Sequence, residues 1–470
     1  MKYPDSFLDN MKVLLKDDFE AFKEALSDDS TSGIRVNESK ISVEHFMEIA
    51  PFQIKRIPFV NNGFYINDTD GWSKHPYYFA GLYYIQEPSA MLPADRLPIS
   101  EGDTVLDLCA APGGKSTMLS TRPLKLLVSN DISFSRTIPL VKNLEIFGCA
   151  RLFVINEDPN KLQNLFPSFF DKILVDAPCS GEGMFRKDDG LIKSYAKNGP
   201  DYYAPIQKSI LKSAVSMLKC GGMLMYSTCT FSNKEDEEVI LEILNERKDL
   251  SLVSIIDYEG FTGPYAQYRN SLKEDGAIHV FPHKLKGEGH FLCLIKKEEN
   301  TEVKQDITEN KSFSSVKTID FESLPDDVKL FLNGYVDSSV FYTRNYLMAK
   351  DGNIYILPKG YKAIMSHNIH FLRTGVLMGN IGKGKKFVPS TALALSNEFG
   401  TIKNCLNLSQ EDSSVIKYLK GETLIINEFD GQDEPQKGFV LIKVDGFPLG
   451  FAKYDGNKFK NLYEKGWVLK

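Results

Sequence analysis

Two of the seven cysteines follow short apolar runs, where a thiol can meet a ligand. Cys179 lies in "DAPCSGEG", after the run 173–175, and Cys229 lies in "YSTCTFS", after the run 223–226. Because parallel strands end on one rim of a sheet, both thiols are expected to open into one crevice. A thiol in such a place can act as a nucleophile. No two cysteines have the Cys-x-x-Cys spacing of a zinc ribbon, so no metal is expected.

Acidic residues follow three successive apolar runs, where parallel strands would end on the same rim. They are Asp131, Asp158 and Asp176. The strand before them leads into "VLDLCAAPGGK" (105–115), whose small residues let a ligand approach the backbone and the amides of a helix N-terminus. This turn is neither Gly-x-Gly-x-x-Gly nor a phosphate loop. Acids that can bind ribose hydroxyls favour a nucleoside ligand, and S-adenosylmethionine fits.

Two thiols beside a methyl donor predict methylation of a pyrimidine at carbon 5. That carbon is a poor nucleophile until a thiolate adds to carbon 6, which divides one hard reaction into two easier steps. The adduct must then lose the carbon-5 proton and expel the thiolate. Asp176 stands where an acid could stabilise the adduct at ring nitrogen 3. The target base would have to leave its stack to enter such a pocket.

The elements that must position these residues lie between about 103 and 296. The apolar runs are Thr104–Leu108, Leu126–Ser129, Leu152–Ile155, Ile173–Val175, Met223–Tyr226 and Phe291–Ile295. Helical spacing occurs near 114–121, 133–147, 160–166, 204–219 and 233–246. Strands that alternate with helices of this length predict a parallel sheet covered on both faces. The last strand follows "GEG" and is expected to pair differently.

Two helix boundaries are marked by local sequence. Ser232 followed by Glu235 predicts a capping box at the start of the last of these helices. Gly221 and Gly222 predict the end of the helix before it, because glycine favours the left-handed conformation that often follows a helix.

Changes in composition divide the chain into five segments. The first combines helical spacing with aromatic-rich runs, and the third, within "KKEENTEVKQDITENKSFSSVK", is polar and charged as linkers are. The last two contain short strand-like runs. We therefore expect an N-terminal α+β domain (1–97), a catalytic domain (98–298), a linker (299–318), a small α+β or β-rich module (319–388) and a final module (389–470).

Most of the chain resembles the RNA cytosine-5 methyltransferases of the Sun type. The resemblance is carried by "DLCAAPGGKS", "SNDIS", "VDAPCSGEGMFRKD" and "YSTCTFS", with "QEPSAMLP" just before the catalytic domain. The tail, with "LRTGVLMGN" and "GFPLGFAKYDGNKFKNLYEKG", resembles the bacterial 16S rRNA (RsmF-like) branch. The resemblance implies a Rossmann-like, doubly wound methyltransferase domain, a small N-terminal α+β domain and a C-terminal β-rich, PUA-like RNA-binding region.

The resemblance also implies roles for single residues. Cys229 is the nucleophile that attacks carbon 6, and Cys179 assists the release of product; Asp176 completes the catalytic set. The residues expected to bind S-adenosylmethionine are Cys109, Ala110, Ala111, Pro112, Gly113, Gly114, Lys115, Asp131, Asp158 and Asp176. The predicted reaction is methylation of carbon 5 of cytosine in 16S rRNA.

Basic residues in two places are candidates for contact with RNA phosphates. Arg186 and Lys187 follow the Pro-Cys loop, and Lys383, Lys385 and Lys386 lie in a glycine-containing loop. The net charge of −6 argues only against non-specific coating of nucleic acid. The expected partner is 16S rRNA, free or in the small ribosomal subunit. No apolar run is long enough to span a membrane, and a cytoplasmic monomer is expected.

Other functions stay open at this point. The substrate could be tRNA, another RNA or DNA. In DNA cytosine-5 methyltransferases the attacking thiol occupies the Pro-Cys position, so Cys179 would attack there. A ribosome-assembly factor that keeps the fold only for binding is a further alternative. The presence of both cysteines and of the cofactor rim favours an enzyme that acts on RNA.

Overall fold

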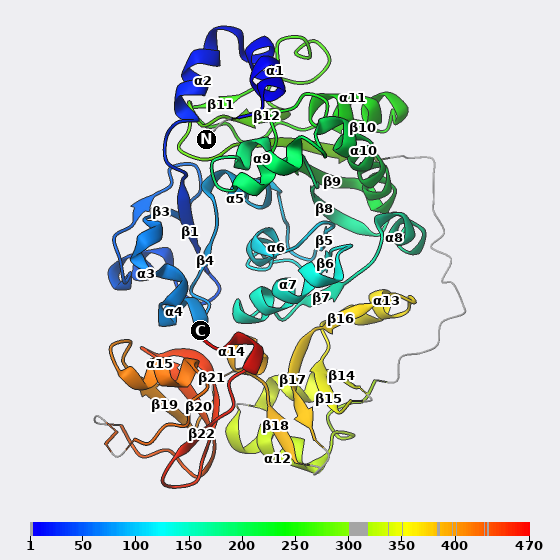
Figure 1. Cartoon of the computed structure of the whole chain (residues 1–470). Coiled ribbons are helices and arrows are strands. Elements are labelled where there is room, and N and C mark those ends of the chain that lie inside the picture. Colours follow the sequence, from blue (N-terminus) through cyan, green and yellow to red (C-terminus); the bar gives the residue numbers. More distant parts are fainter. Residues whose placement is uncertain are drawn as a thin grey trace.

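The computed structural model describes residues 3–299, 318–336, 338–349, 351–382, 386–396, 398–400, 402–426, 428–429 and 432–470 (Figure 1). The predicted linker lies outside these residues except at its two ends, as do Lys383 and Lys385. The predicted fold class is confirmed: a Rossmann-like α/β domain joins a small N-terminal α+β domain and a β-rich C-terminal region. No helix in the described ranges is long and apolar enough to cross a membrane.

The N-terminal domain is an antiparallel sheet flanked by helices, with strand order β2–β3–β1–β4. Its strands are β1 (Ser32–Val36), β2 (Lys55–Arg56), β3 (Gly63–Ile66) and β4 (Tyr83–Ile85). Its helices are α1 (Asp5–Leu15), α2 (Phe19–Ala25), α3 (Val43–Ile49), α4 (Pro76–Phe79) and α5 (Pro88–Arg96). Phe7 and Phe22 of the first two helices pack with Phe185 and Phe231 in one buried aromatic cluster. These helices therefore support the two cysteine-bearing loops from behind.

The central domain is a ten-stranded sheet with helices on both faces (Figure 1). Its strands follow the path β11–β12–β13–β9–β8–β5–β6–β7–β16, and β10 pairs with β13. The first four strands along the chain are β5 (Thr104–Asp107), β6 (Leu126–Asn130), β7 (Leu152–Ile155) and β8 (Phe170–Asp176). The others are β9 (Leu218–Thr228), β10 (Leu250–Leu252), β11 (Phe261–Thr262), β12 (Ala277–Val280), β13 (His290–Lys297) and, from the C-terminal region, β16 (Phe371–Thr374).

Five neighbouring strands, β9, β8, β5, β6 and β7, run parallel, and β13 pairs with β9 antiparallel, as the sequence predicts. The helices are α6 (Gly114–Leu119), α7 (Phe134–Ile146), α8 (Pro159–Leu165), α9 (Asp189–Tyr195), α10 (Pro200–Met217) and α11 (Glu237–Glu246). Val105 and Leu106 are both buried but belong to different clusters, one on each face of the sheet. Burial on both faces explains why these strands read as continuous apolar runs.

Both helix boundaries predicted from local sequence are wrong. The helix after β9 begins at Glu237 with Asp236 as its N-cap, and Glu235 accepts a hydrogen bond from Ser180 instead of capping. The preceding helix ends at Met217, and Gly221 lies inside β9 with a φ of 75°. Tertiary contacts and an irregularity in strand pairing therefore override the local signals.

The C-terminal region contains two further four-stranded sheets, β14–β15–β17–β18 and β19–β20–β21–β22. Its first part comprises α12 (Asp326–Tyr335), β14 (Tyr346–Met348), β15 (Asn353–Ile356), α13 (Tyr361–Met365), β16 (Phe371–Thr374), β17 (Val376–Ile381), β18 (Phe387–Pro389) and α14 (Thr391–Leu395). Its last part comprises β19 (Cys405–Leu408), α15 (Ser413–Leu419), β20 (Gly438–Val444), β21 (Phe447–Tyr454) and β22 (Phe459–Asn461).

This region is joined to the rest of the chain by packing. Strand β16 pairs with β7 and extends the central sheet. The last sheet shares one hydrophobic core with the N-terminal domain, in which Phe46 and Tyr83 cluster with Val440 and Tyr418. The bounds of the five predicted segments stay a prediction, and the four segments other than the linker pack against one another.

Candidate active site

A cavity of about 740 Å³ opens at the carboxyl ends of the parallel strands. Its walls come from β5, β6, β7, β8, β9 and helix α10. It brings together six residues that the sequence singled out: Cys109, Asp131, Asp158, Asp176, Cys179 and Cys229. The cavity runs without interruption from the three acids to the two cysteines, so one ligand bound at the acids would face a second held at the thiols.

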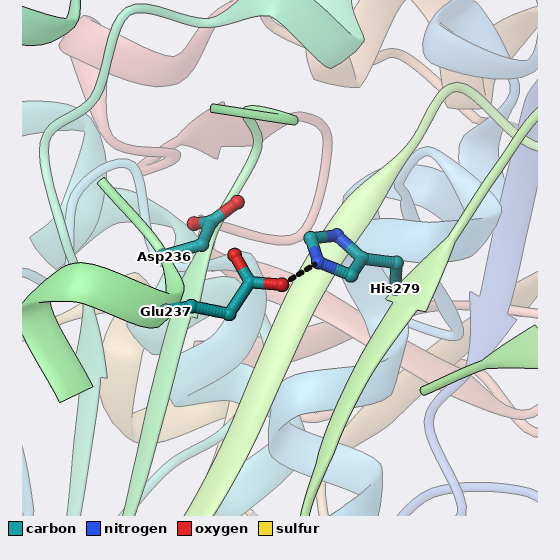
Figure 2. Close-up of side chains that lie close together, drawn as sticks. All are labelled: Asp236, Glu237 and His279. Atoms are coloured by element: carbon teal, nitrogen blue, oxygen red, sulfur yellow. Dashed lines mark hydrogen bonds and ion pairs between the residues drawn. The ribbon is translucent and has the colours of Figure 1, made fainter. Parts of the chain in front are cut away.

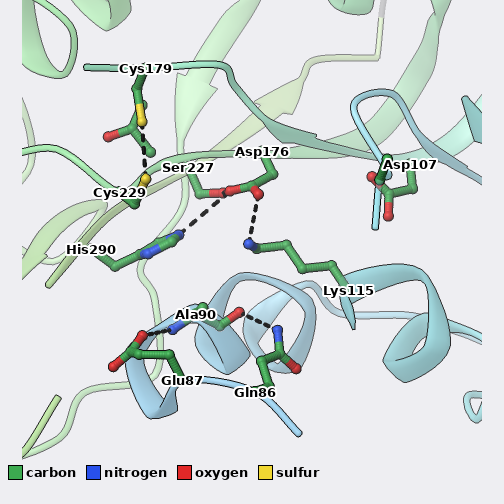
Figure 3. A network of polar contacts seen from close by, with 12 residues as sticks. Gln86, Glu87, Ala90, Asp107, Lys115, Asp176, Cys179, Ser227, Cys229 and His290 are labelled. Atoms are coloured by element: carbon green, nitrogen blue, oxygen red, sulfur yellow. Dashed lines mark hydrogen bonds and ion pairs between the residues drawn. The ribbon is translucent and has the colours of Figure 1, made fainter. Parts of the chain in front are cut away.

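The two cysteines are in direct contact. Their Sγ atoms lie 3.1 Å apart, within hydrogen-bond distance for sulfur (Figure 3). The hydrogen bond with Cys229 and burial together raise the pKa of the Cys179 thiol well above its usual range. Cys179 therefore stays protonated at neutral pH, and its S–H can donate to the sulfur of Cys229.

Asp176 stands at the end of β8 with partners on both carboxylate oxygens (Figure 3). Lys115 donates to Oδ2 at 2.7 Å, and Ser227 donates to Oδ1 at 2.9 Å. The Nε2 atom of His290 lies 3.6 Å from Oδ1. Burial opposes ionisation of Asp176, but Lys115 and then His290 outweigh it and hold the pKa of the carboxyl below its usual range. Asp176 is therefore an anion in the free protein.

The turn after β5 is built for close approach to its backbone. Gly113 has a φ of 113°, which favours glycine, and precedes the N-terminus of α6. The Asp131 carboxylate accepts hydrogen bonds from the amides of Ala111 (3.2 Å) and Ser133 (2.9 Å). Asp131 thus ties the turn to the end of β6. Of the residues expected to bind the cofactor in this turn, Cys109 lines the cavity and residues 110–115 do not.

Asp158 lies at the far end of the cofactor rim. It is exposed, lines the cavity and caps α8 by accepting from the amide of Asn160 at 2.8 Å. Strand β16 approaches this rim, since the amide of His370 donates to Glu157 Oε1 at 2.9 Å. A segment more than two hundred residues away in sequence therefore contributes to the edge of the site.

Arg186 does not reach the solvent as an RNA contact would. Its guanidinium donates to Glu288 Oε2 (2.8 Å), to the carbonyl of Ala25 (2.9 Å) and to the carbonyl of Gly287 (2.7 Å). Only 7% of the side chain is exposed. The predicted phosphate contact of Arg186 is therefore wrong, because its donors are used within the chain. Lys187 and Lys386 are exposed and remain candidates.

Several polar residues near the cysteines were not expected from the sequence. His290 is buried; its Nε2 faces Asp176 at 3.6 Å, and its Nδ1 has no hydrogen-bond partner among the described residues. Asp107 is buried, and burial raises its pKa to about 7 although Ser116 donates to it. Glu182 and Glu235 are buried beside the cysteine loops. His290 lies in "GEGH" and Glu235 lies in "NKEDEE". Nothing in either stretch of sequence indicates that these polar side chains are buried.

One group of side chains has the spacing of a metal site. Ligand atoms of Asp236, Glu237 and His279, all buried, lie within 4.8 Å of one another (Figure 2). The same groups already serve the fold: His279 Nε2 lies 2.9 Å from Glu237 Oε1, and Thr228 donates to Asp236 Oδ1 at 2.6 Å. These contacts tie the start of α11 to β12 and to the end of β9. The expectation of no metal stays a prediction.

Four known families match successive parts of the chain. Residues 3–88 match the N-terminal domain of 16S rRNA methyltransferase RsmF, and residues 94–296 match 16S rRNA methyltransferase RsmB/F. Residues 335–396 match the RsmF rRNA methyltransferase first C-terminal domain, and residues 404–469 match the methyltransferase RsmF PUA domain. These matches confirm the resemblance read from the motifs.

Whole-length relatives agree. Ribosomal RNA small subunit methyltransferase F of Vibrio parahaemolyticus is 29% identical over 97% of this chain and 96% of its own length. The protein of the same name from Shewanella halifaxensis is 30% identical over 91% and 89%. Among solved structures, a methyltransferase homolog protein from Pyrococcus horikoshii is 29% identical, with a TM-score of 0.54, covering 63% of this chain and 95% of its own.

Proposed function

The chain belongs to the 16S rRNA methyltransferase RsmB/F family, and on this basis we propose that it methylates carbon 5 of a cytosine in 16S rRNA, with S-adenosylmethionine as the donor. The observation that carries the proposal is the contact between Cys179 and Cys229 in the cavity that also contains Asp176. A thiol pair of this kind suits a reaction in which one sulfur bonds to the base and must later leave it.

Cys229 is the attacking group in this proposal. In the family, the cysteine of the Ser-Thr-Cys motif attacks and the cysteine of the Pro-Cys motif assists release, and the 3.1 Å contact between the two sulfurs places Cys179 where its S–H can donate to Cys229. The thiolate of Cys229 adds to carbon 6, the carbon 5–carbon 6 double bond opens, and carbon 5 becomes nucleophilic as ring nitrogen 3 takes a proton. After methyl transfer, a water molecule takes the carbon-5 proton, the electron pair of that C–H bond restores the carbon 5–carbon 6 double bond, and the carbon–sulfur bond breaks with its electron pair on the Cys229 sulfur. The S–H of Cys179 can stabilise the departing thiolate through their 3.1 Å contact.

Asp176 and Lys115 act as a pair on the ring of the cytosine. Because Lys115 keeps Asp176 ionised, the carboxylate can accept a hydrogen bond from the exocyclic amine of the base. The ammonium group of Lys115, 2.7 Å from the carboxylate, offers the proton that ring nitrogen 3 requires as the adduct forms. In this scheme Asp176 positions the cytosine and relays a proton from Lys115 to ring nitrogen 3, so it does not supply the proton by itself.

The residues of the rim fit S-adenosylmethionine. Asp131 is placed to accept hydrogen bonds from ribose hydroxyls, and Ile132, 65% exposed and lining the cavity, offers an apolar face to an adenine ring. The small side chain of Cys109 lines the cavity beside the turn and leaves room there for the cofactor. When bound, the cofactor supplies the methyl group. The chain's own part is to hold it with the sulfonium side toward Asp176 and the cysteines, since the cavity is continuous between them.

The proposal is tested by trapping the covalent adduct in two variants. Cys179→Ala and Cys229→Ala are incubated with 16S rRNA and S-adenosylmethionine, and a denaturation-resistant protein–RNA band is sought. We expect a band with Cys179→Ala and none with Cys229→Ala. A band with Cys229→Ala alone would assign the attack to Cys179, as in enzymes on DNA. RNA binding with no methyl transfer by the wild type would indicate an assembly factor.

The substrate is tested in the same assay. We expect methyl transfer to 16S rRNA, either free or in the small subunit, and no comparable transfer to tRNA or DNA. Comparable transfer to tRNA would refute the rRNA assignment and leave the chemistry intact.

A further inference from the structure

We propose that Glu182 and Glu235 position the two catalytic thiols in a crossed arrangement, in which each carboxylate lies on the loop of one cysteine and fixes the loop of the other. The inference rests on the proposed function, because it assigns the two thiols separate steps. Both side chains are buried, at 1% and 0% exposure, and neither is expected to touch the base. They are positioning residues.

Glu235 follows Cys229 in the chain, but its shorter hydrogen bonds hold the loop of Cys179; its Oε1 also accepts from the hydroxyl of Thr230, beside Cys229, at 3.3 Å. Its Oε2 accepts from the amide of Ser180 at 2.9 Å, and the Ser180 hydroxyl donates to Oε1. Gln207, on α10, donates to Oε2 at 2.8 Å and to the carbonyl of Pro178 at 2.9 Å. The residues on either side of Cys179 are therefore anchored to Glu235, directly or through Gln207.

Glu182 follows Cys179 in the chain but holds the loop of Cys229. Its Oε2 accepts from the amide of Phe231 at 3.0 Å, and its Oε1 accepts from the Tyr195 hydroxyl at 3.0 Å. The amide of Gly183 donates to the carbonyl of Cys229 at 2.9 Å. A Cβ at position 183 would stand 2.8 Å from the carbonyl oxygen of Gly289, so only glycine allows this approach.

Two buried carboxylates so close together are costly for the fold. Burial raises the pKa of Glu182 to about 7, with Glu235 adding to the effect, and burial also raises the pKa of Glu235. No lysine or arginine in the described ranges forms an ion pair with either. Apolar side chains at these positions would destabilise the folded state less than buried carboxylates do. What the carboxylates provide is acceptors for the amides of Ser180 and Phe231, which fix the backbone around each thiol.

The crossed arrangement makes a prediction that a general loss of structure does not. Glu235→Ala should behave like Cys179→Ala: methyl turnover falls at least tenfold and the protein–RNA adduct accumulates. Glu182→Ala should behave like Cys229→Ala: turnover falls at least tenfold and no adduct forms. Glu235→Gln and Glu182→Gln should recover most of the activity, because an amide oxygen can still accept from the backbone amide.

The experiment runs all four variants beside the two cysteine variants, with turnover, adduct formation and cofactor affinity measured for each. Tyr195→Phe and Gln207→Leu keep both glutamates and should give the same crossed pattern more weakly, which covers the case of an alanine variant that does not fold. The opposite assignment of the phenotypes, identical phenotypes, or no change in either would overturn the inference. If the cysteine standards themselves fail to behave as expected, the proposed function fails instead.

Discussion

Replacement of Arg186 by Met should destabilise the protein without weakening the electrostatic part of RNA binding. Arg186 forms a buried ion pair with Glu288, which is completely buried, and donates to two backbone carbonyls. The substitution removes the cation that pairs with Glu288. The carboxylate keeps the hydrogen bond that it accepts from the amide of Thr31 in the N-terminal domain. Breaking a buried ion pair from one side costs about 3–5 kcal/mol. At about 2 °C per kcal/mol in a large domain, the melting midpoint should fall by about 6 °C or more.

The dependence on pH follows from Glu288. Burial raises the pKa of this carboxyl and Arg186 lowers it, so loss of Arg186 raises the pKa further. An acid whose pKa is higher in the folded than in the unfolded state binds more protons when folded, and its contribution to stability falls as the pH rises. The deficit of Arg186→Met should therefore be larger at pH 8 than at pH 5.5.

The measurement is thermal unfolding at both pH values, with Lys187→Met as the matched control. Lys187 is the adjacent residue and is exposed, so its replacement should change stability by less than about 0.5 kcal/mol. RNA affinity is then measured against salt concentration. Lys187→Met should reduce the salt slope, and Arg186→Met should not. An unchanged melting midpoint together with a reduced slope for Arg186→Met would refute this reasoning and return Arg186 to the RNA interface.

Two further predictions concern the residues proposed for catalysis and for cofactor binding. Lys115→Met removes the main group that lowers the pKa of Asp176, so the carboxyl stays protonated to higher pH and the acid limb of methyl turnover should move upward; an unshifted profile would contradict the role of the pair. Asp131→Ala should weaken S-adenosylmethionine binding by about 10-fold or more, as the loss of a charged hydrogen bond does. Calorimetry would show this, and a larger effect from the exposed Asp158→Ala would reverse the ranking of the two acids.

The strand-end residues could be predicted because the pattern that places them is local. An apolar run followed by small residues or an acid reports both a buried strand and its end, so Asp131, Asp176, Cys179 and Cys229 were found together without the structure. The parallel order of the strands then brings them to one rim. The position of a residue along a strand, and hence its place on the rim, depends little on distant contacts.

Residues whose roles depend on distant partners could not be predicted. The local sequence around Arg186 indicates a solvent-exposed cation. The fold brings Glu288, about one hundred positions later, into contact with it and buries both side chains. Glu235 has the spacing of a capping-box residue, but in the structure its carboxylate accepts hydrogen bonds from the amide and the hydroxyl of Ser180 instead. The addition of β16 to the edge of the central sheet is equally invisible, since a four-residue strand carries no signal of its partner.

The same long-range contacts bear on how RNA is presented to the cavity. The last sheet shares a core with the N-terminal domain, and Tyr77 donates to Asp445 at 2.9 Å across that junction. At the other end of the C-terminal region, β16 is part of the central sheet beside the cofactor rim. The PUA region is thus packed against the N-terminal domain, and the module that precedes it is packed against the central sheet. Under the proposed function, an RNA bound to the PUA region would meet the cavity at a fixed distance, so the shape of the RNA between the two contacts would select the cytosine that reaches Cys229.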